Sequence, residues 1–67
     1  MEEAYRQALK IFERDISKEE FLRIFQLQFQ NIDEYRKERE KLTIEQQGAF
    51  THIAVAYRRL LRERGEL

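Results

Sequence analysis

The only imidazole in this 67-residue chain is His52, and the chain has no cysteine, so metal or nucleophilic chemistry would have to begin at this histidine. On a helix, its neighbours one turn away are Gly48, Thr51, Val55 and Ala56. None of these is an acid or a metal ligand, and the spacings used by zinc or di-iron helical sites do not occur. We therefore expect no metal and no cofactor, and we assign His52 to the surface or to an interface.

The acidic residues are the remaining candidates for chemistry, as general acids or bases. Glu19 and Glu20 fall in an expected first helical turn, where capping and the helix dipole account for them. Glu34, Glu38 and Glu40 alternate with Arg and Lys, as on a solvated helix. Acid–base catalysis needs a carboxylate held in an apolar, concave site, and no pattern here marks one. We expect no catalytic residue, no enzymatic activity and no small-molecule substrate.

A basic cluster near the end of the chain is the strongest charged feature, and it contains Arg58, Arg59, Arg62 and Arg64. One interpretation is that these cations complement the negative end of a helix dipole. The other is that they bind an anion or an acidic partner, and for this role we expect Arg58, Arg59 and Arg62 to form the rim of a binding surface. The net charge is zero, which disfavours nucleic acid as the partner without removing it as an alternative.

Two capping patterns define the elements that must position these residues. Ser17 and Thr43 are each followed three residues later by Glu or Gln, ahead of apolar residues at helical spacing. With no proline in the chain, they predict an all-α, single-domain, three-helix bundle with helices at about 2–14, 18–41 and 44–64. The second and third helices should form a long antiparallel hairpin, with the shorter first helix packed across it. Gly65 is placed to end the last helix.

The second helix has an alternative form. Asn31 begins another capping pattern, so the helix could break there, but no Gly or Pro marks a break, and Ile32 and Tyr35 keep the phase of the preceding apolar stripe. We favour the continuous helix. Gln28 falls inside that stripe, where a buried amide needs hydrogen-bond partners.

The outer face of the third helix is unusually free of charge, since Glu45 is the only charged residue between Leu42 and Tyr57. A helix with two weakly polar faces is usually buried on both, either at the centre of its own fold or against a partner. A chain this short often gains stability by associating, most commonly as a symmetric dimer. The residues that we predict to form a partner-binding surface are Leu27, Gly48, Thr51, His52 and Val55.

The composition limits the remaining function classes. No apolar run approaches the ~20 residues of a membrane span, and the acidic start at residues 1–4 lacks the apolar region of a secretory signal, so we expect a cytoplasmic protein. The expected function is a non-enzymatic regulatory, adaptor or inhibitor protein that binds another protein and self-associates. The alternatives are a nucleic-acid-associated regulator that uses the Arg clusters of a dimer, and a structural subunit of a larger assembly.

Overall fold

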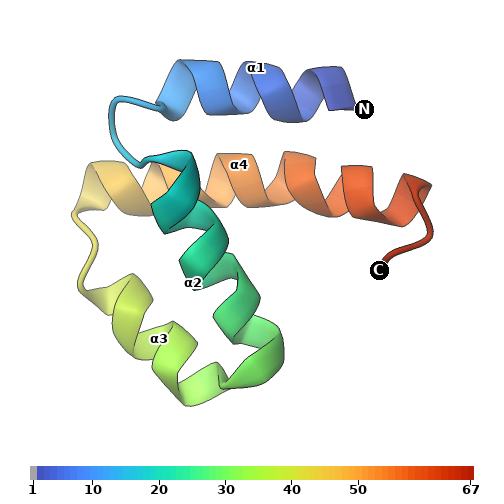
Figure 1. Cartoon of the computed structure of the whole chain (residues 1–67). Coiled ribbons are helices and arrows are strands. Elements are labelled where there is room, and N and C mark those ends of the chain that lie inside the picture. Colours follow the sequence, from blue (N-terminus) through green and yellow to red (C-terminus); the bar gives the residue numbers. More distant parts are fainter. Residues whose placement is uncertain (1) are drawn as a thin grey trace.

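The computed structural model describes residues 2–67, and all the regular structure in this part of the chain is helical. The helices are α1 (Glu2–Phe12), α2 (Lys18–Gln30), α3 (Ile32–Glu40) and α4 (Ile44–Glu63). Figure 1 shows α1 alongside α4, whereas α2 crosses α4 and α3 returns beside α2 to the start of α4. The molecule is flat, with Cα extents of 29 × 26 × 15 Å.

The predicted helix caps are confirmed by hydrogen bonds. The Ser17 hydroxyl accepts from the backbone N–H of Glu20 at 3.2 Å. Thr43 and Gln46 form both bonds of a capping box, each 3.1 Å long. At the other end of α4, Gly65 has a φ of 72°, a conformation that glycine adopts without strain, and this residue ends the helix as predicted.

The prediction of a continuous helix over residues 18–41 is wrong, because the helix is interrupted at Asn31. This residue is extended, with φ −155° and ψ 93°. Its N–H donates to the Leu27 carbonyl at 2.7 Å, which ends α2, and its side chain accepts from the Glu34 N–H at 3.2 Å, which starts α3. A single residue is therefore the C-cap of one helix and the N-cap of the next. The extended conformation of Asn31 lets α3 fold back along α2. Tyr35 then contacts Phe50 on α4, with 6.2 Å between the ring centroids.

The expected long hairpin of a second and a third helix is also wrong, because α4 pairs with α1 and α2 pairs with α3. The α1·α4 pair is antiparallel (Figure 1). At one end Glu2 lies 3.4 Å from Arg64, and towards the other the Phe12 ring stacks on His52 at 4.9 Å. The observed all-helical fold thus has four helices in two antiparallel pairs that cross, in place of a three-helix bundle.

The core lies where α2 crosses α4. Phe21 and Ile24 from α2 and Phe50 and Ile53 from α4 have no exposed surface, and the Phe21 and Phe50 rings lie 5.1 Å apart. Burial of a side chain of this size contributes about 2–3 kcal/mol. Helix α3 contributes no buried residue, so its position depends on contacts made by half-buried side chains. The other buried residues are Tyr5, Ile16, Phe25, Ala49, Ala54, Ala56 and Leu60.

Candidate interaction site on helix α4

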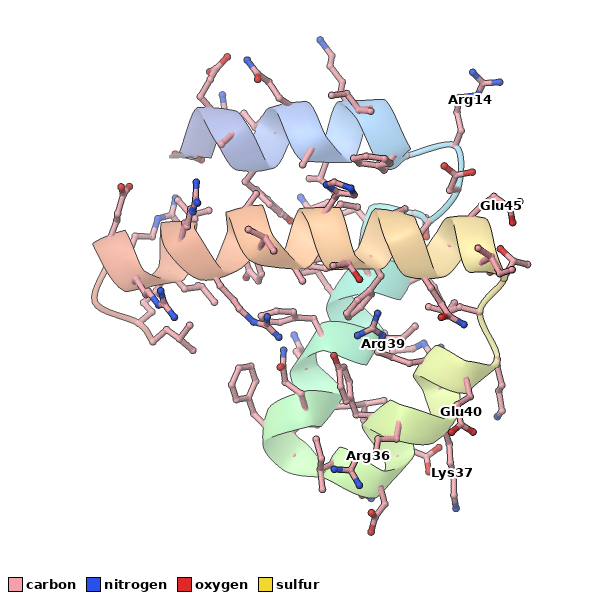
Figure 2. The ribbon with its side chains drawn as sticks, turned by 180° about the vertical axis from the view of Figure 1, so that it is seen from behind. Arg14, Arg36, Lys37, Arg39, Glu40 and Glu45 are labelled. Atoms are coloured by element: carbon pink, nitrogen blue, oxygen red, sulfur yellow. The ribbon has the colours of Figure 1, made fainter. Side chains whose placement is uncertain are left out.

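One row of side chains follows the outer face of α4. Its residues are spaced by four, three, four, three and four positions, the spacing that keeps side chains on one side of a helix. In Figure 2 no other helix lies in front of α4. Ile44 is 85% exposed and Val55 is 47% exposed, high values for β-branched apolar residues. The row consists of Ile44, Gly48, Thr51, Val55, Arg58 and Arg62.

The C-terminal half of the row surrounds a cavity of about 290 Å³, which is lined by Val55, Arg58, Arg59 and Arg62. The structure thus brings one partner-surface residue and all three rim arginines of the sequence prediction together. No acid lines this cavity, and in the described part of the chain none of the three arginines forms an ion pair. The site therefore presents three arginines that form no ion pair with the described residues, next to an apolar side chain.

Arg58 is held in place by neutral groups. Its Nη2 donates to Gln28 Oε1 at 2.9 Å, and its guanidinium carbon lies 5.8 Å from the centroid of the Phe25 ring. The side chain is half-buried, so this charge is partly removed from water without a carboxylate to compensate it. Gln28 Nε2 is buried and has no hydrogen-bond partner in residues 2–67, so the predicted need of Gln28 for partners is met at the oxygen alone.

Arg23 shows how an arginine outside the site differs. It forms ion pairs with Glu20 and with Glu38, the latter at 3.2 Å, and so joins α2 to α3. The hydrogen bond from Arg23 holds the pKa of Glu38 below its ordinary value, with a smaller contribution from Lys41. The charge of Arg23 is thus compensated by carboxylates, whereas the three arginines around the cavity on α4 form no ion pair with the described residues.

The N-terminal half of the row is neutral and partly used within the fold. The Thr51 hydroxyl donates to the Gln47 carbonyl at 3.0 Å and accepts from Arg39 Nη2 at 3.1 Å. His52 is exposed but lies against α1, with its ring nearly parallel to that of Phe12. Gly48 is exposed, and a Cβ at this position would meet no atom within 4 Å. The fold of the single chain therefore does not require glycine there.

The remaining predicted residue, Leu27, is half-buried on α2 and is not part of the row on α4. Ile44 was not among the predicted surface residues, although it lies eleven residues before Val55, a separation that places both on one side of a helix. The contact between Arg58 and Gln28 was not predicted either, because these residues are thirty positions apart and no local pattern joins them.

Two further properties concern residues 2–67 as a whole. No group of three or more His, Cys, Asp or Glu side chains in this range is arranged to hold a metal ion. None of the helices that the structure describes combines the length and the apolar character needed to cross a membrane.

Comparison with known proteins finds no matching family, no matching curated protein and no matching solved structure. The fold and the site define a small protein of two crossed helix pairs, with an open helix face that is apolar and neutral at one end and basic at the other.

Proposed function

We propose that this protein acts without catalysis, as a regulatory or adaptor protein that docks the outer face of α4 onto an acidic, amphipathic segment of another protein. The observation that supports this most directly is the set of three arginines around a cavity beside Val55, none of which forms an ion pair with another residue of 2–67.

The chemistry of this surface suits a protein partner. Guanidinium groups bind carboxylates through paired, charge-assisted hydrogen bonds, and arginine is enriched among the residues that dominate binding energy. Arg58 is already positioned by Gln28 and Phe25, so less side-chain freedom is lost when a carboxylate binds it. Val55 adds apolar contact area next to these charges.

The same geometry indicates the form of the partner. The row runs straight along a 20-residue helix, so an extended or helical segment can follow it over several turns. A helix that carries two acids about one turn apart, beside an apolar residue, would place carboxylates at the arginines and the apolar group at Val55.

A library of short displayed peptides tests the proposal, because it samples many candidate partner sequences at once. Selection on the wild-type protein should enrich amphipathic sequences with paired acids. Their affinity should fall by about tenfold or more for Val55→Arg and for the double variant R59E/R62E, since apolar and charged contacts are each worth on the order of 1 kcal/mol or more.

A charge-matched control is R36E/K37E. Both residues are exposed and lie on α3, away from α4 (Figure 2). Selected peptides should bind this control as they bind the wild type. Peptides without acidic enrichment, or equal binding to all variants, would rule out the α4 face as the docking site.

The second candidate function is binding of nucleic acid through the same arginines, which phosphate would also suit. A labelled DNA duplex and the selected peptides can be compared at low and physiological salt. Phosphate contacts predict a steep loss of duplex binding as salt rises, whereas docking that includes Val55 predicts peptide binding that persists. A structural subunit of a larger assembly, the remaining alternative, would be insoluble or unfolded when expressed alone.

A further inference from the structure

We infer that the outer row of α4 also binds the same row of a second copy of this chain, with the two α4 helices antiparallel across a two-fold axis. This inference rests on the proposed role of the face as a docking surface, and it identifies one occupant of that surface. Its support comes from the symmetry of the row, from the size of the residues that the symmetry brings together, and from charge.

The row is symmetric about its own midpoint. Its spacings of four, three, four, three and four read the same in both directions, so a two-fold axis between Thr51 and Val55 superimposes the row on itself reversed. That axis pairs Val55 with Thr51 of the other copy, and Arg62 with Ile44 of the other copy. A homodimer with such an axis is the commonest closed assembly, and it needs a surface that is complementary to itself.

The same axis pairs the longest side chain with the position that has none, because Arg58 falls opposite Gly48 of the other copy. Glycine in a helix interior costs about 1 kcal/mol relative to alanine. The single chain has no packing reason for it, since a Cβ on Gly48 would contact nothing. In the dimer, glycine at position 48 leaves space for the aliphatic part of Arg58 from the second copy.

Charge determines the direction of the pair. The row is basic at its C-terminal end and has no basic residue at its N-terminal end, so parallel helices would place arginines against arginines. In the antiparallel pair, the flanking residue Glu45 faces Arg59 of the other copy, because equivalent flanks meet in antiparallel helix dimers. Glu45 projects from the start of α4 in Figure 2 and forms no ion pair within the described residues.

Sedimentation equilibrium of the full chain, from low micromolar to millimolar concentration, is the first measurement. The wild type should show a reversible monomer–dimer equilibrium. Gly48→Leu should abolish the dimer, while circular dichroism shows an intact fold, because the single chain has room at this position. A monomer at all concentrations, or a dimer that is unaffected by Gly48→Leu, would overturn the inference.

Charge exchange tests the register. Glu45→Arg and Arg59→Glu should each weaken the dimer by about tenfold, since two symmetric pairs change from attraction to repulsion. The double variant E45R/R59E should restore the affinity. Matched reversals at Arg36 and Glu40, which Figure 2 shows on α3, should leave it unchanged. A double variant weaker than both single variants would contradict the antiparallel register.

Direction can be read independently by cross-linking, because the chain has no cysteine of its own. An oxidised mixture of Thr51→Cys and Val55→Cys should form mainly the mixed disulfide in the antiparallel dimer. Predominance of the two homodisulfides would indicate parallel helices and would overturn the inference.

Selected peptides separate this inference from the proposed function. A monomeric wild type that still binds acidic peptides at Val55 would remove the dimer and leave the docking face. If the wild type neither dimerises nor binds acidic peptides, the outer face of α4 is not a docking surface.

Discussion

Arg39 is predicted to hold α3 against the rest of the molecule. Its guanidinium carbon lies 4.7 Å from the Phe50 ring centroid and 5.8 Å from that of Tyr35. Its nitrogen atoms also donate to Thr51 Oγ1 at 3.1 Å and to the Tyr35 hydroxyl at 3.3 Å. Figure 2 shows this side chain extending from α3 towards α4. Because α3 has no buried residue, replacing Arg39 with methionine should measurably destabilise the fold.

The size of the effect can be worked out from these contacts. A cation over an aromatic ring at a half-buried position contributes about 1 kcal/mol, and each hydrogen bond contributes about 1 kcal/mol. Ordering an arginine side chain costs up to about 2 kcal/mol, and the methionine retains part of the apolar stem contact. The net loss for Arg39→Met is therefore about 1–2 kcal/mol. A chain of this length has a total stability of roughly 3–10 kcal/mol, so the loss is a large fraction.

Urea unfolding followed by circular dichroism measures this change. With a denaturant dependence of about 1 kcal/mol per molar urea, the midpoint should fall by about 1–2 M. Arg36→Met is the matched control, since Arg36 is on the same helix but exposed, with no hydrogen bond or ion pair to the described residues. An equal effect for both variants, or no effect for Arg39→Met, would refute the reasoning. A double-mutant cycle with Phe50→Leu should give a coupling of about 1 kcal/mol.

Two further predictions concern the helix caps and the ion pair between α2 and α3. Asn31→Ala and Thr43→Ala each remove one side-chain acceptor of a cap, for the Glu34 N–H and the Gln46 N–H respectively, so each should cost about 1 kcal/mol. The second capping-box bond, from the residue 43 N–H to Gln46 Oε1, is kept by alanine. Unchanged melting of Asn31→Ala would contradict its role as the cap of α3. Because the folded-state pKa of Glu38 lies below the ordinary value of 4.5, its stabilising contribution is present above that pH and is lost as the pH falls through the folded-state value. Urea midpoints should decline on acidification, and Glu38→Gln should flatten that part of the profile, whereas an unchanged profile would mean that Arg23 does not stabilise the fold through Glu38.

Local signals in the sequence predicted the features that depend on neighbouring residues. Ser17 and Thr43 cap helices as expected, because a cap needs a side chain and a backbone N–H only three residues apart. Gly65 could be predicted to end α4 because the left-handed conformation that ends the helix is favourable for glycine and depends on this one residue. Val55 and the three cavity arginines lie together because they fall within two turns of one helix, and their role in binding stays a prediction.

The predictions that were wrong concern features that depend on contacts between residues distant in sequence. Helix propensity around Asn31 favours continuation, and the break is stabilised by tertiary contacts of α3, which brings Tyr35 and Arg39 to Phe50. The pairing of α1 with α4 likewise depends on contacts such as that of Tyr5 with Tyr57. Their ring centroids lie 4.8 Å apart, although most of the chain separates the two residues in sequence. An apolar stripe shows that a helix face is buried, but not which helix covers it.

The pairing of α1 with α4 has a consequence for how the chain assembles during synthesis. Helices α2 and α3 are adjacent in sequence and need only short loop closures, whereas Phe12 meets His52 only after roughly 40 further residues have been added. Of the four helices, α1 leaves the ribosome before the others and its partner α4 leaves after them. The side of α1 that packs on α4 therefore stays without this partner until α4 has been made, so the α1·α4 pair forms later than the α2·α3 pair.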